Sequence, residues 1–172
     1  MGKVTSIKPA KLITGFIFKS EVSLKQAEDS LTRKFGRIDF RSRIMPFDLT
    51  DYYRQEFGSG LNRVFVSFRK LINPARLPEI KRITNNIETK LSLKSKRLVN
   101  IDPGYLDLAK VILASTKDYA HRIYLAKGIF AEITLSFKGN SFKAWEWTYP
   151  DYRKEEYIII FNKIRDIYLN QI

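Results

Sequence analysis

The hydrophobic and polar positions along the chain follow a two-residue repeat in some segments and a helical repeat in others. Apolar residues dominate 11–18, which predicts a central strand. Helical spacing of apolar residues over 24–35 predicts a helix after it. A capping box of Ser23 and Gln26 opens this helix, and Gly36 is placed to end it.

Two further stretches, 37–45 and 61–69, alternate between apolar and polar residues and predict strands. Arginines occupy the positions opposite the apolar ones, so the pattern predicts one wet, basic face of a sheet. These arginines are Arg37, Arg41, Arg43, Arg63 and Arg69. Pro78 near a first turn and apolar residues at helical spacing over 80–91 predict a second helix.

The second half of the chain begins with a strand predicted at 98–101. Asp102 and Pro103 form a good N-cap and N1 pair, which favours a helix over 105–115, although 110–114 could equally be a strand. Further strands are predicted at 122–125, 129–137 and 142–147, and an amphipathic helix at 157–168.

This order of elements predicts the α+β class. The opening β-α-β-β-α-β portion matches the split βαβ arrangement of ferredoxin-like folds. We therefore expect a single mixed, mainly antiparallel sheet, with helices mainly on one face and an amphipathic helix at the C-terminus. No repeat or Gly/Ser-rich linker interrupts the chain, so residues 1–172 are expected to form a single domain.

Charge changes this picture, because the net charge of +13 is unevenly distributed. Residues 1–100 carry 21 Lys and Arg against 9 Asp and Glu, whereas residues 101–172 carry 10 against 9. Such asymmetry favours a polyanionic partner, nucleic acid or nucleotide, although Lys and Arg could merely solubilise the surface. Absent Cys, three Gln and abundant Lys, Arg, Ile and Tyr are also typical of a thermophilic composition.

Composition also limits location and cofactors. No apolar run reaches the roughly 20 residues that a membrane crossing needs, so no membrane insertion is expected. The absence of Cys excludes disulfides and thiolate metal sites. A cytoplasmic location is the expectation, and the sequence indicates no particular cofactor.

The most reactive candidates are His121, Arg122 and Glu132. His121 is the only histidine and could act as a general acid or base, or pair with Asp118 in a turn. Arg122 offers a planar fork suited to phosphate. Glu132 shares one side of its strand with Phe130 and Thr134. If that side is buried, Glu132 needs a partner, and Arg122 or a hard cation is the natural choice.

A second group of candidates is polar or aromatic. Asp102 could act in catalysis or cap a helix whose N-terminus binds an anion. Phosphate-friendly donors follow at Ser115, Thr116 and Lys117, and Trp147, Tyr149 and Arg153 could contact the same ligand, by stacking in the case of the aromatic rings. Packing of those rings against the sheet is the competing interpretation.

Two patterns of metal-binding residues are weaker. Asp102 and Glu132 suggest the Asp…Glu-x-Lys pattern of metal-dependent nucleases, but Thr134 stands at the lysine position. Asp48 and Asp51 could ligate a metal or cap a turn, and capping is favoured. No metal site is therefore predicted.

The polar runs resemble a prokaryotic family known as domain of unknown function 4416, over about 12–153. The most specific segments are Asn100-Ile101-Asp102-Pro103-Gly104-Tyr105, Ser115-Thr116-Lys117, His121-Arg122-Ile123-Tyr124 and Trp147-Thr148-Tyr149-Pro150-Asp151-Tyr152-Arg153. The resemblance implies a compact single-domain protein and brings no established activity or cofactor. Some members are labelled GTP-binding, but this sequence lacks the Gly-x-x-x-x-Gly-Lys-Ser/Thr loop that cradles phosphates.

Three functional hypotheses follow. The first is a protein that binds a phosphate-bearing ligand, nucleotide or nucleic acid, and acts on it in a cleft lined by Asp102, Lys117, His121, Arg122 and Glu132. The second is a non-catalytic RNA- or DNA-binding module that uses the basic sheet face. The third is an assembly protein, a homo-oligomer, whose aromatic C-terminal part pairs with another subunit.

Overall fold

The computed structural model describes residues 2–47, 57–94 and 96–172. Asp48 and Asp51 lie outside these residues. The strands are β1 (Lys11–Phe18), β2 (Ile38–Arg41), β3 (Met45–Phe47), β4 (Leu61–Phe68), β5 (Val99–Leu106), β6 (Lys110–Ser115), β7 (Arg122–Ala126), β8 (Ile129–Lys138) and β9 (Ser141–Ala144). The helices are α1 (Glu21–Phe35), α3 (Leu77–Lys90) and α4 (Glu155–Leu169), with short 3-10 turns η2 (Pro74–Arg76) and η3 (Pro150–Arg153).

The strands of the described segments form one antiparallel sheet in the order β2-β4-β1-β5-β6-β8-β7, with β3 paired to β4 and β9 paired to β8. The α+β class and the mainly antiparallel sheet are thus confirmed. The opening portion, in the order β2-β4-β1-β5, is compatible with a split βαβ arrangement. The ferredoxin-like assignment itself stays a prediction.

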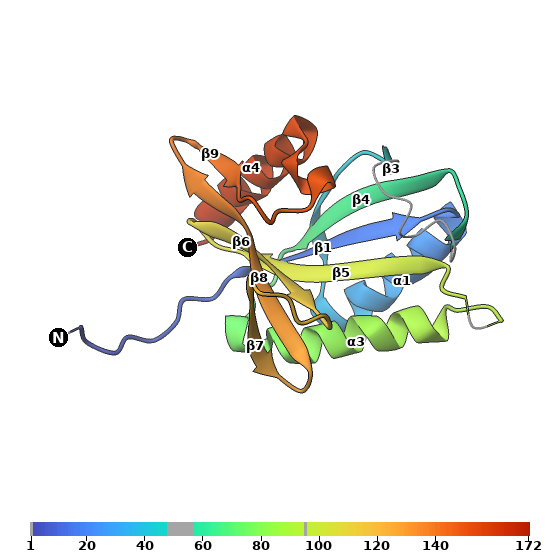
Figure 1. The fold of residues 1–172 in the computed structure, drawn as a ribbon, viewed down its shortest axis with the longest axis horizontal. Helices are drawn as coiled ribbons and strands as arrows, with labels where there is room; N and C mark the ends of the chain where they lie inside the picture. The colour runs from blue at the N-terminus through green and yellow to red at the C-terminus, as the bar shows by residue number, and fades with distance from the viewer. Residues whose placement is uncertain (1, 48–56, 95) are drawn as a thin grey trace.

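Helices cover both faces of the sheet (Figure 1). Leu12, Phe16 and Phe18 of β1 pack with residues of α1 and α3 in one hydrophobic cluster. Ile13 of the same strand packs with residues of α4 in another. Two helices therefore share one face and the C-terminal helix lies on the other. Within the described segments, no helix is long and apolar enough to span a membrane.

Local signals placed α1 correctly but misidentified its start. The helix begins at Glu21 after Ser20, and Ser23 is buried in the first turn, so the predicted capping box is not formed. Gly36 follows the last turn with φ 90°, as predicted, because glycine tolerates positive φ. The strand predicted at 37–45 is two short strands, β2 and β3, that both pair with β4.

The helix predicted after Asp102 is wrong. β5 continues through Asp102 and Pro103 to Leu106, and Lys110–Ser115 forms β6, the strand alternative for that segment. Asp107 makes the turn between the two strands, because its Oδ1 accepts hydrogen bonds from the backbone N–H groups of Ala109 and Lys110. Pairing of β5 with β1 along its whole length outweighs the local helix signal.

The sheet splits between β5 and β6. These strands pair only from Gly104 to Leu106, opposite Leu113 to Val111. Gly104 permits this contact, since a Cβ there would lie 2.2 Å from the Ile112 carbonyl oxygen. Beyond Gly104, residues 99–103 pair with β1 alone. This separation of two sheet halves creates the space described next.

Candidate functional site

A cavity of about 660 Å³ lies where the sheet halves separate. Its volume falls within the roughly 300–1,000 Å³ of small-molecule sites. Its walls come from β4, α3, β5, β6, β7, β8 and the segment before α4. The charged and polar residues that line it are Arg63, Lys81, Asn85, Glu88, Thr89, Arg97, Asn100, Asp102, Ser115, Thr116, Lys117, Arg122, Glu132 and Asp151, with Phe47, Tyr119, Tyr149 and Tyr152 among the aromatic ones.

Residues 99–103 of β5 have no partner among the described strands on the side of β6, and side chains of α3 bind the β5 backbone there. Glu88 accepts a hydrogen bond from the Ile101 backbone N–H, and the Lys81 ammonium donates to the Ile101 carbonyl oxygen at 3.1 Å. Arg97 donates to the other Glu88 oxygen at 3.1 Å. Burial raises the pKa of Glu88 above its ordinary value, against the opposing effects of Lys81, the Ile101 N–H and Arg97. The exposed strand edge is therefore satisfied by charged groups that also face the cavity.

Lys81 is the least compensated of these charged groups. It is buried, and its bond to Ile101 uses one of three ammonium donors. Among the described residues, the nearest carboxylate oxygen belongs to Asp102, 4.0 Å away. Lys81 thus places a positive charge on the cavity wall without a close ion pair.

Arg63 lies in the cavity wall and not on a wet sheet face. It is buried on the side of the sheet that α4 covers, so its predicted outward orientation is wrong. Its NH2 group donates to Asp151 at 2.6 Å, and its NH1 group lies 3.4 Å from Asp102. The guanidinium also packs over the rings of Phe47 and Tyr152. Arg63 therefore ties β4 to β5 and to η3.

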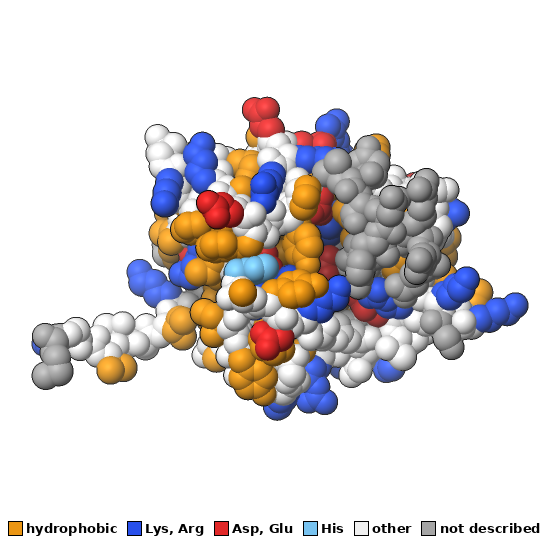
Figure 2. Space-filling view, in the orientation of Figure 1, with side chains coloured by type: hydrophobic (Ala, Val, Ile, Leu, Met, Phe, Trp, Pro, Cys, Tyr) orange, Lys and Arg blue, Asp and Glu red, His pale blue; other side chains and the backbone are white. Residues whose placement is uncertain are grey.

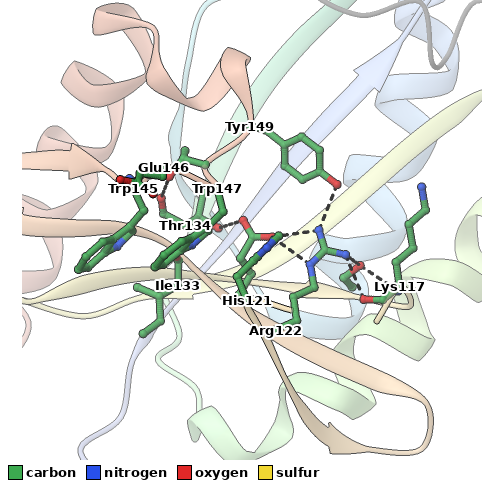
Figure 3. A network of polar contacts seen from close by, with 12 residues as sticks. Lys117, His121, Arg122, Ile133, Thr134, Trp145, Glu146, Trp147 and Tyr149 are labelled. Carbon is green, nitrogen blue, oxygen red and sulfur yellow. Dashed lines mark hydrogen bonds and ion pairs between the residues drawn. The ribbon is translucent and has the colours of Figure 1, made fainter. Parts of the chain in front are cut away.

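Arg122 makes four hydrogen bonds and one further ion-pair contact with other described residues. Its Nε and NH2 groups contact Glu132 at 3.0 and 2.9 Å, and NH1 donates to the Ser115 hydroxyl at 2.7 Å and the Lys117 carbonyl at 3.0 Å. NH2 also donates to the Tyr149 hydroxyl at 3.1 Å (Figure 3). A phosphate could gain an Arg122 donor only by displacing one of these partners.

Glu132 is the buried partner that its strand pattern demanded. Arg122 and Glu132 are each 2% exposed, which confirms the predicted pairing. The same carboxylate contacts His121 Nε2 at 3.1 Å, and Thr134 donates to its second oxygen at 3.3 Å. Since an ionised carboxylate only accepts hydrogen bonds, Nε2 carries the proton in a neutral His121, which leaves Nδ1 as the basic atom.

His121 is visible at the surface, with hydrophobic side chains around it (Figure 2). Trp147 stacks on His121 with ring centroids 5.9 Å apart, and Trp145 stacks on Trp147 at 5.1 Å. The Tyr119 ring is tilted against that of His121, with centroids also 5.9 Å apart. Trp147 further donates to the Ile133 carbonyl at 3.0 Å. These contacts fix Trp147 beside His121. Trp147 does not line the cavity, whereas Tyr149 and Pro150 of the same segment do.

The segment 145–153 bridges the two sheet halves across the cavity. Tyr149 binds Arg122 of β7, and Asp151 binds Arg63 of β4. The Thr148 hydroxyl anchors the segment to the Thr134 carbonyl at 2.6 Å. Arg153 donates to the Thr148 carbonyl at 2.7 Å and to the Glu146 carbonyl. Arg153 therefore shapes this segment and does not line the cavity.

The structure brings most of the predicted site residues together. Asp102, Ser115, Thr116, Lys117, Arg122, Glu132 and Tyr149 line the cavity. His121 and Trp147 adjoin it through Glu132, and Arg153 is set apart. The sequence interpretation missed Lys81, Glu88 and Asp151. Lys81, Asn85 and Glu88 do follow one face of α3 at i, i+4 and i+7, but that spacing alone also fits a solvated helix face.

The five arginines predicted to form a basic face do not share one. Arg41 pairs with Glu28 of α1 at 2.8 Å, whereas Arg43 pairs with Glu156 of α4 at 2.5 Å, and these helices cover opposite faces. Arg63 is buried, and Arg37 and Arg69 are exposed. The single wet surface on which the nucleic-acid hypothesis depended is thus absent from the described segments.

Within residues 2–47, 57–94 and 96–172, no group of three or more His, Asp or Glu side chains is arranged to hold a metal ion. The carboxylates of the cavity instead pair with cations. Glu88, Glu132 and Asp151 each contact an arginine. These carboxylates therefore serve as partners of arginine side chains in the cavity wall.

The fold and site define an α+β protein with a ligand-sized, highly charged cavity in a split antiparallel sheet. The chain belongs to the family described as Domain of unknown function (DUF4416), whose family model matches residues 8–168. The resemblance seen in the sequence is therefore confirmed. No curated protein and no solved structure matches the chain.

Proposed function

We propose that the protein binds a small phosphate-bearing ligand in the cavity between β5 and β7. Lys81 is the observation that carries the proposal. Its buried ammonium lines the cavity and retains donors beyond its single bond to Ile101. A phosphate oxygen would accept a hydrogen bond from these donors and bring a negative charge closer to the ammonium than the Asp102 carboxylate, which lies 4.0 Å away.

Ser115, Thr116 and Lys117 support the same proposal from the opposite wall. The Ser115 hydroxyl oxygen accepts from Arg122 and from the Lys117 backbone N–H at 3.1 Å, so its own proton is the group it can donate to a ligand. The Lys117 side chain extends away from Arg122 (Figure 3). The Ser115 hydroxyl therefore gives this wall a donor, as Lys81 does on the other.

The cavity favours a small ligand over a nucleic-acid strand. Nucleic acids are bound along continuous basic surfaces that follow the phosphate backbone. Here Arg41 and Arg43 pair with carboxylates on opposite faces and Arg63 is buried, which leaves Arg37 and Arg69 exposed among the five arginines predicted for that purpose. The cations that face a common space are those of the cavity.

His121 gives the proposal a proton-transfer group. Glu132 lines the cavity and orients the ring through Nε2, which leaves Nδ1 as the basic atom. Within the proposal, Glu132 is a positioning residue, because it would act through His121 and Arg122. Asp102, which is partly exposed and loosely paired with Arg63, is the carboxylate with most freedom to contact a ligand.

Titration of the protein with pyrophosphate and with nucleoside diphosphates, followed by calorimetry and melting temperature, tests the proposal. We expect saturable binding that Lys81→Met weakens at least tenfold. Arg82→Met is the matched control, since Arg82 is exposed on the same helix. Equal affinity of Lys81→Met and the unaltered protein, or no binding of any phosphate compound, would refute the proposal.

A further inference from the structure

We infer that the ligand carries a planar ring as well as phosphate, with the ring at Tyr119 and Tyr149 and the phosphate towards Lys81. A mononucleotide is the class of compound that has both parts. The inference rests on the proposed function and goes further, since it assigns a chemical group to each end of the cavity.

Two exposed aromatic residues carry the first step. Tyr119 and Tyr149 line the cavity, yet they are 47% and 43% exposed. The rest of the wall is dominated by charged and polar side chains, which do not favour burying an apolar ring face. Exposed aromatic faces beside phosphate-binding groups are the means by which proteins hold bases without reading their edges.

Arg122 fixes the positions of both rings. Its guanidinium carbon lies 4.6 Å from the Tyr119 ring centroid and 5.9 Å from that of Tyr149. The Tyr149 hydroxyl is also held by the 3.1 Å bond from Arg122. Because Glu132, Ser115 and Lys117 hold the guanidinium in turn, the rings are ordered before a ligand arrives. Preorganised groups lose less entropy on binding.

The two ends lie on different halves of the split sheet. Lys81 contacts β5 at Ile101, whereas Tyr149 contacts Arg122 of β7. β5 and β6 pair only from Gly104 to Leu106, so no pairing between the described strands joins Ile101 to the half that contains β7. A compound with a ring, a sugar and phosphates carries a group suited to each end.

Calorimetric titration with three probes tests the assignment: pyrophosphate, nucleosides, and a panel of purine and pyrimidine nucleoside diphosphates. Replacing Tyr119 and Tyr149 together by Leu should weaken the best nucleoside diphosphate roughly five- to 150-fold, as expected for a lost stacking contact. Affinity for pyrophosphate should stay the same. Lys81→Met should weaken pyrophosphate and the diphosphate alike, and leave nucleoside binding unchanged.

Two variants control for indirect effects. Tyr149→Phe removes the bond to Arg122 but keeps the ring, so it should retain most of the nucleotide affinity. Tyr124→Leu alters an exposed tyrosine of β7 outside the cavity wall and should change nothing.

The outcomes separate the inference from the proposed function. If pyrophosphate binds through Lys81, but no nucleoside diphosphate binds more tightly or the Leu variant weakens both probes equally, the ring assignment is wrong and phosphate binding stands. If neither probe binds, the proposed function falls and the ring assignment falls with it.

Discussion

Two buried arginines, Arg63 and Arg122, hold the cavity walls in place. Arg63 is paired with Asp151, 88 positions further along the chain, and Arg122 is paired with Glu132, which lies opposite it on the neighbouring strand. Removal of a charge from water is costly and is offset only when the partner and the remaining donors are well placed. These pairs therefore contribute mainly to the arrangement of the walls. Removing one partner of a buried pair should lower the stability of the fold far more than removing one partner of an exposed ion pair.

Glu132→Ala should destabilise the protein strongly, because it leaves Arg122 buried without its carboxylate. Breaking a buried pair in this way typically costs about 3–5 kcal/mol. Urea unfolding monitored by fluorescence measures the loss. Glu79→Ala, which breaks the exposed pair with Arg76, is the control and should leave the unfolding midpoint unchanged. Equal urea midpoints for both variants would show that the buried Arg122–Glu132 pair contributes no more to stability than the exposed Arg76–Glu79 pair.

Alkaline stability should depend on Tyr157. Burial raises the pKa of Tyr157 to about 12 from its ordinary value of 10, although Arg63 acts in the opposite direction. Between pH 10 and 12 the unfolded chain loses this proton while the folded chain keeps it, so stability falls as pH rises. Tyr157→Phe should therefore lose less stability than the unaltered protein between pH 9 and 11.4 in urea titrations. Parallel losses in the two proteins would contradict the assignment.

At the residue scale, alternation predicted which side chains share a side, but not which side is covered. It offered Arg122 or a hard cation as the partner of Glu132 if that side of the strand was buried, and the buried Glu132 pairs with Arg122. The same reasoning placed Arg63 outside, because nothing near β4 in the sequence indicates that α4 covers that face. The burial of Arg63 depends on Asp151, 88 positions further along the chain.

At the element scale, the short contact of β5 with β6 determines where the cavity opens. Only the last residues of β5 pair with β6, and Gly104 allows the backbones to meet. At Ile101, nearer the start of β5, charged side chains of α3 bind the backbone of the strand edge. The element therefore serves two purposes: one end closes the sheet and the other forms a cavity wall.

Gly104→Ala should push β5 and β6 apart. The added Cβ would lie 2.2 Å from the Ile112 carbonyl oxygen, which is backbone and cannot move alone. Overpacking of this kind typically costs about 1–3 kcal/mol or more, and ligand affinity should fall with it. Gly2→Ala, which meets nothing within 4 Å, is the control. Melting temperature measures the first effect and calorimetric titration the second.

Periodicity predicted the long elements well, including α1, α3, α4 and most strands. It failed at 102–115, where Asp102 and Pro103 have the composition of a helix start but continue a strand. Hydrogen bonding to β1 on one side, and to β6 from Gly104 to Leu106 on the other, decides the outcome. Such pairing joins residues far apart in sequence, which a local pattern cannot report.

At the scale of the whole molecule, the net charge of +13 and the cavity have separate consequences. The exposed Lys and Arg side chains attract any polyanion weakly, whereas the cavity holds a smaller set of cations among carboxylates. A general excess of charge indicated a polyanionic partner from the sequence. It could not indicate a cavity, because the walls combine segments from Phe47 to Tyr152.

Salt should distinguish these two kinds of binding. Retention on single-stranded DNA should fall steeply between 50 and 200 mM salt, because each released counterion weakens binding. The melting-temperature increase caused by a saturating nucleoside diphosphate should fall much less, since charges in a cavity are screened less than exposed ones. Parallel losses would instead favour binding along the exposed surface.

The pairing of Arg63 with Asp151 has a consequence for biosynthesis. The ribosome releases the arginine long before its carboxylate, so a nascent chain must keep the guanidinium hydrated until the last quarter of the polypeptide arrives. Premature termination after residue 148 would remove η3 and α4, and with them the nearer of the two carboxylates that pair with the buried arginine. The pocket is thus finished only when the C-terminal segment docks, and incomplete chains should be unable to recognise a ligand.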